Sequence, residues 1–268
     1  MHSRGEALHS AQVTWEAVLQ SSEDGREWGN QLFWVADALS ESGALRRSLT
    51  DTSRTVDDRT ALARTIFFGK VDSHVLDIVV YVVAQRWSRD DDFLNAFEAL
   101  GVQTLLESAS KGNRLSDVEE QLYRILRLLG RQRALRVALG DRAVPAEKRE
   151  ELARTVFVHL LPESLDLLIR AVHRAPDPTI AFALSQYIDA AGECGRHLIA
   201  SVTVARELTP AQIARLTRIL SERYGEAVAV HVTVRPSVVG GIRIHIGEDV
   251  IDGTLATRIN NAKELMTK

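Results

Sequence analysis

Residues 44–67 of this chain reappear, with their charges and breaks, at residues 134–157. Ala44-Leu45-Arg46 aligns with Ala134-Leu135-Arg136, and in the same register Ala63-Arg64-Thr65 aligns with Ala153-Arg154-Thr155. Charged positions match as well as leucines. We therefore interpret the repeat as duplication of one module rather than as the general likeness of Leu- and Ala-rich helices. Each copy, at about 90 residues, is long enough for a small helical bundle with its own core.

The repeated region has a helical period throughout, from about residue 6 to residue 188. Leu122, Ile125, Leu126 and Leu129 show it by forming one apolar stripe at i, i+3, i+4 and i+7. Glycine is sparse, and the breaks between apolar stretches fall at single glycines and prolines. We predict two related helical modules, at residues 4–95 and 96–190.

The period changes from helical to two in the last part of the chain, which we assign to an α/β domain at residues 195–268. Alternating apolar residues predict strands over residues 198–204, 228–234 and 242–246. Between the first two, Thr209, Pro210 and Gln212 form the N-terminal signature of a helix. Thr254 can cap a final helix. The fold class is therefore α+β: duplicated helical bundles followed by a small mixed-sheet domain.

Gly240 and Gly241 separate the last two predicted strands, which we expect to pair as a hairpin through Pro236 to Gly241. A phosphate-binding loop would require glycines that open a helix, whereas these open a strand. We therefore interpret Gly240 and Gly241, together with Gly247 and Gly253, as structural turn residues. At least one of the first pair should have a positive φ.

No catalytic, cofactor-binding or metal-binding residue is predicted. The eight histidines contain no HxxxH or HExxH pair, and the single cysteine, Cys194, has no partner at metal spacing. His231 and His245 are expected on the solvent side of their strands. The formal net charge of −3 provides no electrostatic case for binding nucleic acid. No apolar run approaches the roughly 20 residues of a spanning helix, so we expect no direct membrane insertion.

A run of arginines near the centre of the chain has two interpretations. It contains Arg124, Arg127, Arg131, Arg133 and Arg136. The first interpretation is a solvated basic face, partly neutralised by neighbouring glutamates. The second is a protein interface that docks an acidic helix, for which Arg124, Arg127 and Arg131 are the candidates. Stacking on nucleic acid is disfavoured because no aromatic residues are interleaved with them.

Residues 235–254 read RPSVVGGIRIHIGEDVIDGT. This segment closely resembles the C-terminal signature of the delta subunit of F-type ATP synthases, known in mitochondria as the oligomycin-sensitivity-conferring protein. The likeness extends from about residue 198 to residue 265. The helical region, especially residues 115–122 and 145–149, is similar to the six-helix bundle of that family. Ordinary members have one such module, and the duplicated length resembles actinobacterial forms.

The resemblance implies a non-catalytic stator subunit without a cofactor, in a heteromeric complex at the cytoplasmic face of the plasma membrane. The helical region would bind alpha subunits of the catalytic head. The C-terminal domain would bind the b-type stalk subunit, so that proton flow is coupled to ATP synthesis. Some duplicated forms carry a fused membrane-spanning stalk segment. None is visible here, so the stalk is expected to be another polypeptide. The alternative is a regulatory helical adaptor with an α/β cap.

Overall fold

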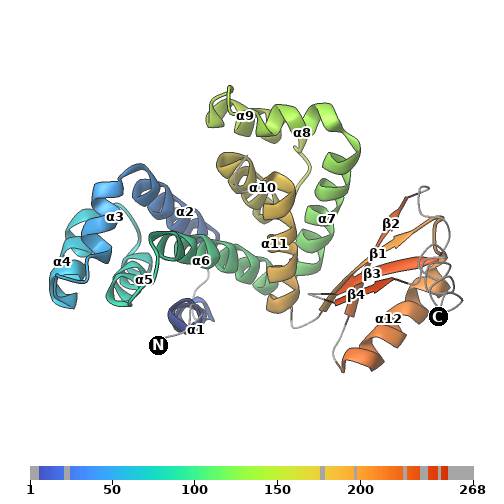
Figure 1. Cartoon of the computed structure of the whole chain (residues 1–268), viewed down its shortest axis with the longest axis horizontal. Helices are drawn as coiled ribbons and strands as arrows, with labels where there is room; N and C mark the ends of the chain where they lie inside the picture. The colour runs from blue at the N-terminus through green and yellow to red at the C-terminus, as the bar shows by residue number, and fades with distance from the viewer. Residues whose placement is uncertain are drawn as a thin grey trace, which may run out of the picture.

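The computed structural model describes residues 6–20, 25–175, 179–195, 198–225, 228–235, 241–246 and 249–252. A first group of helices, a second group and a sheet follow one another along the long axis of the molecule (Figure 1). The first group consists of α1 (Glu6–Gln20), α2 (Gly25–Glu41), α3 (Gly43–Thr50), α4 (Val56–Phe67), α5 (Ser73–Ala84) and α6 (Asp90–Lys111). The second consists of α7 (Leu115–Arg131), α8 (Arg133–Gly140), α9 (Ala146–Val156), α10 (Pro162–Arg174) and α11 (Ile180–Cys194).

Both copies of the sequence repeat occupy equivalent helices. Leu62 and its neighbours lie in α4 and Leu152 and its neighbours in α9, each directly after the short helix α3 or α8. The helix contacts correspond as well, because α2, α3, α4 and α5 contact one another in sequence as α7, α8, α9 and α10 do.

A buried arginine makes the same bonds in each copy. In the second copy, Arg149 Nη1 donates to the carbonyl oxygens of Leu139 (3.2 Å), Val172 (2.7 Å) and Ala175 (3.2 Å). In the first, the matching contacts run from Arg59 Nη1 to the carbonyl oxygens of Leu49 (3.3 Å), Val83 (2.8 Å) and Gln85 (3.5 Å). These carbonyls lie at or beyond helix C-termini, where the regular intrahelical donors run out, although the Ala175 N–H also reaches the Val172 carbonyl at 3.3 Å. The arginine therefore supplies the missing donors and joins three helices of its module.

Helix α6 belongs to both helical groups. Its N-terminal half contributes Phe93, Phe97 and Leu100 to the core shared with α1 to α5. Its C-terminal half contributes Leu105 and Leu106 to the core shared with α7 to α11. The sequence boundary at residues 95 and 96 falls within this continuous helix, so no linker separates the two groups at that point.

The close packing of α2 on α6 depends on a glycine. A Cβ atom placed on Gly101 would lie 2.4 Å from a ring carbon of Phe33, a distance that real structures do not show. Phe33 thereby reaches the second core although it lies on a helix of the first group. The two helical groups are thus packed together through α2 as well as through α6.

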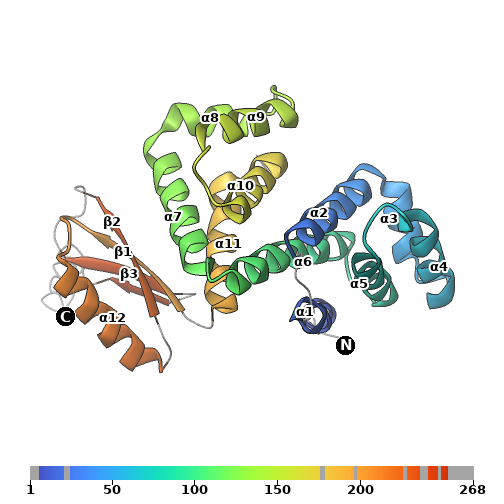
Figure 2. The same ribbon diagram turned by 180° about the vertical axis from the view of Figure 1, so that it is seen from behind.

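The C-terminal part is a mixed sheet of four described strands in the order β2-β1-β3-β4. Their bounds are β1 (Leu198–Val204), β2 (Val228–Val234), β3 (Ile242–Ile246) and β4 (Asp249–Asp252). β1 is parallel to β2 and antiparallel to β3. α12 (Pro210–Tyr224) connects β1 to β2 and lies on one face of the sheet (Figure 2). Thr209 and Gln212 form the predicted capping box at its start.

The predicted hairpin between residues 228–234 and 242–246 is wrong, because β1 lies between these two strands. Alternation shows which face of a strand is buried and does not identify its neighbour. Residues 249–252, which lie between the predicted turn residues Gly247 and Gly253 and for which no strand was predicted, form β4. Gly241 has a φ of +86°, in the predicted left-handed region. Gly240, Gly247, Gly253 and the final helix from Thr254 lie outside the described residues.

Arg149→Met should lower the free energy of unfolding by about 2–4 kcal/mol, because several buried carbonyl oxygens would lose a charged donor. Arg59→Met should have a similar effect, since the same bonds recur in the first copy. Urea unfolding followed by circular dichroism measures both. Arg142→Met is the control, because Arg142 is exposed and lies between α8 and α9. This variant should change the free energy of unfolding by less than about 0.5 kcal/mol. Equal effects at all three positions would contradict this role of the buried arginines.

Candidate functional site

Two joints determine how the three parts of the molecule are held together, and the first lies between the helical groups. Its centre is Arg170 of α10, whose side chain is 5% exposed. Arg170 Nε donates to Glu98 Oε2 of α6 at 2.9 Å, and Nη2 also contacts Glu98. Nη1 lies 2.8 Å from both carboxylate oxygens of Asp37 on α2. The guanidinium also lies 4.9 Å from the centre of the Phe33 ring.

A second ion pair lies beside this centre. Arg26 of α2 pairs with Asp166 of α10, with Nε at 2.7 Å from Oδ2 and Nη2 at 3.1 Å from Oδ1. Asn30 donates to the same carboxylate at 3.2 Å. Asp77, which corresponds to Asp166 in the first copy, instead forms an exposed pair with Arg64 at 3.4 Å. The same residue type therefore joins the two modules in one copy and faces solvent in the other.

The charged groups of this joint shift the pKa values of Arg170 and His173. Burial alone would lower the pKa of Arg170, but its bonds to Glu98 and the attraction of Asp37 outweigh burial and raise the pKa above its ordinary value. His173, next to Arg170 on the helix, has a raised pKa because Glu150 accepts a hydrogen bond from its ring at 2.7 Å and Asp37 adds attraction, against the opposing effect of burial. Arg170 is therefore charged throughout the physiological range, while His173 is the titrating group of the joint.

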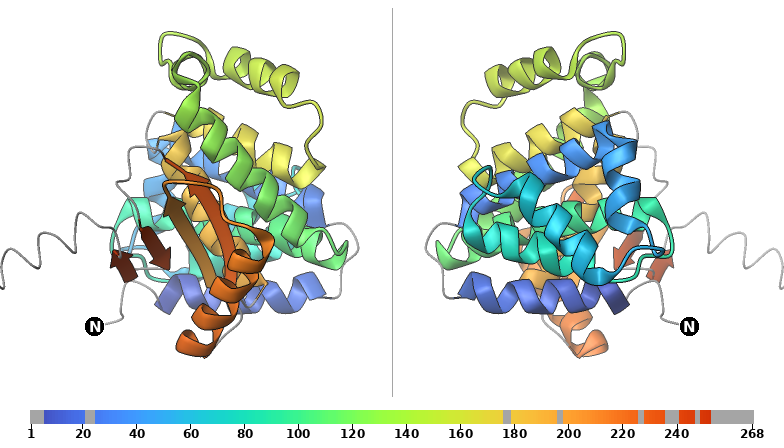
Figure 3. Two further views of the ribbon diagram at one scale, coloured as in Figure 1. Left: turned by 90° about the vertical axis from the view of Figure 1, so that its right-hand side faces the viewer. Right: turned by 90° about the vertical axis from the view of Figure 1, so that its left-hand side faces the viewer.

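The second joint lies between α7 and the sheet, on the face opposite α12 (Figure 3). The ring of Tyr123 stacks on His231 of β2, with centroids 4.4 Å apart. The Tyr123 hydroxyl lies 3.2 Å from the carbonyl oxygen of His231 and 2.9 Å from Thr233 Oγ1. His231 Nε2 lies 2.5 Å from Glu119 Oε1, and Arg127 Nη1 donates to the Val232 carbonyl at 3.1 Å. Polar bonds and ring stacking thus attach the outer strand β2 to α7.

The three arginines of the predicted interface have different surroundings in the structure. Arg127 bonds to β2 within the chain, Arg124 pairs with Glu120 at 2.7 Å on the surface, and Arg131 is exposed. The expectation that His231 faces solvent is wrong, because its side chain is 10% exposed and packs on α7. His245 is exposed as predicted. Tyr123 was missed, and Glu119 was expected only as a glutamate that partly neutralises the arginine run. Each directly follows a buried apolar residue of α7, Leu122 and Val118 respectively.

The described residues contain no group of three or more His, Cys, Asp or Glu side chains that could hold a metal ion. Within the same residues, no helix is both long enough and apolar enough to cross a membrane. The arrangement around the two joints is one of paired charges, hydrogen bonds and ring stacking. These contacts fix the orientation of the two helical groups and the sheet relative to one another.

Comparison with known proteins identifies relatives over almost the whole chain. A family model described as ATP synthase delta (OSCP) subunit matches residues 102–266. The ATP synthase subunit delta of Beutenbergia cavernae is 35% identical over 266 residues, covering 98% of each chain. That of Kineococcus radiotolerans is 33% identical over 259 residues, covering 96% of this chain and 94% of the relative. The matched range of the family model begins inside α6, so it includes only one of the two helical groups.

A chain from the Toxoplasma gondii mitochondrial ATP synthase hexamer also resembles this structure. The superposition covers 64% of this chain and 97% of the other, with 17% sequence identity and a TM-score of 0.40.

Arg170→Met should lower the free energy of unfolding by about 3–5 kcal/mol, because buried Glu98 would lose its two short bonds and keep only the longer ion pair with Arg174 at 3.6 Å. The double variant Arg170→Met/Glu98→Met should recover much of this loss, since no buried unpaired charge remains at Glu98. Urea unfolding of the two single variants and the double variant measures the coupling. Additive losses would contradict a buried pair.

The pH dependence of the joint follows from His173. The pKa of His173 is raised in the folded state. The free energy of unfolding that protonated His173 contributes is therefore fully present below the unfolded pKa of about 6.5, and it is lost as the pH rises through the folded pKa. The destabilisation caused by His173→Gln should therefore be larger at about pH 6 than at about pH 9. Urea midpoints at the two pH values test this, with His159→Gln as the exposed control. A His173→Gln effect independent of pH would contradict the assignment.

Proposed function

This chain belongs to the ATP synthase delta (OSCP) family, and on that premise we propose that it is a non-catalytic stator subunit of the peripheral stalk. It links the alpha/beta catalytic head to the b-type stalk on the cytoplasmic face of the plasma membrane. Proton flow turns a rotor, and the head must not turn with it. The subunit contributes resistance to that rotation and requires no cofactor.

The observation that carries this proposal is the pair of fixed joints. The Arg170 centre joins the two helical groups, and the contacts of Tyr123 and Arg127 attach the sheet to the second group. A protein that transmits torque must resist bending between its two attachment points. Stacking and charge-assisted bonds across both joints favour such stiffness.

The two ends of the molecule present different surfaces for two partners. In our proposal the helical groups bind N-terminal helices of the alpha subunits, and the sheet domain binds the distal end of the b-type stalk. Linking two contacts in one stiff chain raises the effective concentration of each for the other. A stator of this kind fails when either end is free, even if the remaining contact is intact.

Truncation after Gly195 should uncouple the synthase. It removes the sheet domain directly after α11 and leaves both helical cores complete. The truncated chain should bind the head but lose attachment to the stalk. ATP synthesis and ATP-driven proton pumping in inverted membrane vesicles should both fall, while ATP hydrolysis on the head persists. Circular dichroism of the truncated chain controls for folding.

The regulatory adaptor is the alternative that this experiment separates. An adaptor would modify activity without carrying torque, so vesicles with the truncated chain would remain fully coupled. Full coupling would therefore overturn the stator proposal.

A further inference from the structure

His231 of β2 lies at the joint between the sheet and α7, with a carboxylate facing each of its two ring nitrogens. Nε2 lies 2.5 Å from Glu119 Oε1, and Nδ1 lies 3.4 Å from Glu120 Oε2. The side chains of His231 and Glu119 are 10% and 4% exposed, so their contact is largely removed from water. One imidazole ring therefore connects the sheet to two consecutive residues of α7.

The number of hydrogen bonds that this ring can donate depends on its charge. The imidazolium cation has an N–H on both ring nitrogens, whereas the neutral ring has one N–H and one lone pair. In either neutral tautomer the lone pair would face a carboxylate, that of Glu119 or that of Glu120. Only the cation can donate to both carboxylates, and hydrogen bonds between charged groups are the stronger ones.

The neighbouring charged groups of α7 leave both of these carboxylate contacts available to the ring. Arg124 Nε pairs with Oε1 of Glu120 at 2.7 Å, while the His231 ring faces the other oxygen of the same carboxylate. Arg127 Nη1 donates to the Val232 carbonyl oxygen. The Tyr123 hydroxyl bonds on the far side of the stacked ring, to Thr233 and to the His231 carbonyl oxygen.

The sheet and α11 place their charged groups farther from the ring. In register with His231 is the uncharged Ser201 of β1, and beyond it on this face His245 lies on β3, followed by Arg243. α11 contacts the sheet through β1, and its carboxylates Asp189 and Glu193 are exposed. Glu119 and Glu120 are therefore the groups that decide which charge of His231 fits the joint.

His173, at the joint between the helical groups, is placed in the same way. Nδ1 lies 2.7 Å from Glu150 Oε1 of α9, and Nε2 lies 3.6 Å from Asp37 Oδ1 of α2. The hydrogen bond to Glu150 and the attraction of Asp37 raise the pKa of His173, against burial and the charge of Arg170. Each joint thus holds an imidazole between two carboxylates, and at the first joint this arrangement favours the imidazolium.

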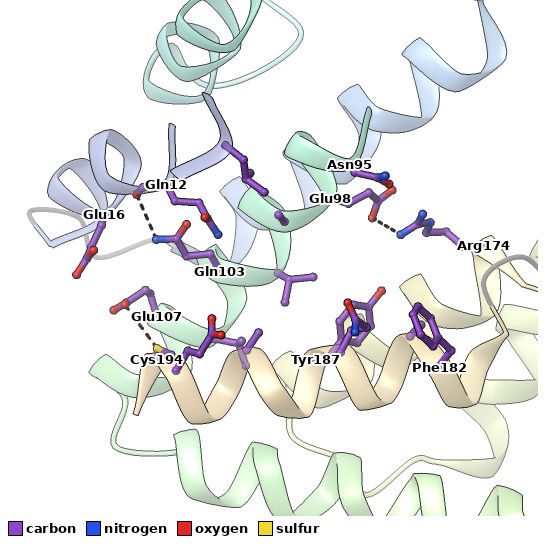
Figure 4. Close-up of a pocket in the computed structure, with 18 residues that line it drawn as sticks. Gln12, Glu16, Asn95, Glu98, Gln103, Glu107, Arg174, Phe182, Tyr187 and Cys194 are labelled. Carbon is purple, nitrogen blue, oxygen red and sulfur yellow. Dashed lines mark hydrogen bonds and ion pairs between the residues drawn. The ribbon is translucent and has the colours of Figure 1, made fainter. Parts of the chain in front are cut away.

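Two other polar contacts, between α6 and the second helical group, do not titrate near neutral pH. Figure 4 shows Glu98 paired with Arg174 at 3.6 Å and Cys194 Sγ donating to Glu107 Oε1 at 3.5 Å. Arginine stays charged, and burial followed by the charge of Glu107 raises the pKa of the Cys194 thiol to about 12. Histidine, by contrast, ordinarily changes its charge between about pH 5 and pH 8.

We propose that His231 is a pH-dependent latch between the sheet and the second helical group. Its imidazolium holds the sheet against α7 through Glu119 and Glu120, and loss of the ring proton weakens this hold. The sheet is therefore attached more firmly at about pH 6 than at about pH 9. Ring stacking and the Tyr123 hydroxyl bonds do not need that proton, so deprotonation loosens the joint without abolishing it. The latch goes beyond the proposed stator function and belongs to the chain itself.

The test follows the distance between two spin labels, one on each side of this joint, in the full-length chain. Gly130→Cys on α7 and Ala214→Cys on α12 supply the attachment sites, and Cys194→Ser removes the native thiol. Both label positions are exposed, and a Cβ atom on Gly130 would meet nothing within 4 Å. Double electron–electron resonance measures the fraction of molecules outside the attached distance. That fraction should be at least about threefold larger at pH 9 than at pH 6.

Three variants separate His231 from the rest of the surface. His231→Gln should give the same distances at both pH values, because its side chain does not titrate. His245→Gln is the matched control, an exposed histidine on the same face of the sheet, and should keep the wild-type response. Glu120→Gln should reduce the response to less than about half, since an amide can accept from the imidazolium or donate to the neutral ring.

Distances independent of pH in the wild-type chain, or a full pH response in His231→Gln, would overturn the latch. Circular dichroism controls for folding. Glu120 is 44% exposed, so Glu120→Gln tests the latch even if His231→Gln does not fold, and an undiminished response there would also overturn it. Ring nitrogen NMR of His231 should show two N–H groups at pH 6, and a single one would contradict the imidazolium. The isolated chain gives all of these results, so they are independent of whether the stator proposal holds.

Discussion

The position of one buried guanidinium determines how the two helical modules sit against each other. Arg170 meets Glu98 on the shared helix and Asp37 on a helix of the first module. Removing such charges from water costs several kcal/mol per ion, so a buried pair of this kind adds little net stability. Its effect is on specificity, because any other docking angle would leave a charge buried without a partner. The stiffness proposed for the stator therefore depends on a contact that strongly disfavours any other arrangement of the two modules.

The two copies have kept one set of interactions and changed another. Arg59 and Arg149 bind corresponding carbonyl oxygens, which shows that the internal construction of the module is retained. At the position of Arg170 the first copy has Tyr81, whose hydroxyl lies 2.6 Å from that of Ser10 on α1. A tyrosine completes an ordinary helix contact there, whereas an arginine at the same position reaches the neighbouring module. Duplication thus supplied two similar bundles, and the contact between them arose from substitutions on one face.

The helical repeat, the two-residue period and the capping box of α12 were predictable because each depends on neighbouring residues. The strand order was not, since alternation in residues 228–234 and 242–246 says nothing about the strand between them. His231 was misplaced for a related reason: polar residues on a strand indicate a face that avoids the apolar core, and α7 covers that face with polar groups. The joint at Arg170 involves residues far apart in sequence. No local pattern could have brought them together.

The shared helix α6 has a consequence for how this chain can vary. Each residue of an α-helix turns the chain by about 100° and advances it by about 1.5 Å. One residue inserted near Gly101 would rotate the second module about that helix by more than a quarter of a circle, separating Phe33 from the space that the glycine leaves for it. Substitutions along α6 change side chains one at a time. The number of residues in α6, by contrast, sets the angle at which the second helical module is rotated relative to the first. A change in length would be tolerated only in whole-turn steps, and then with a matching change in α2.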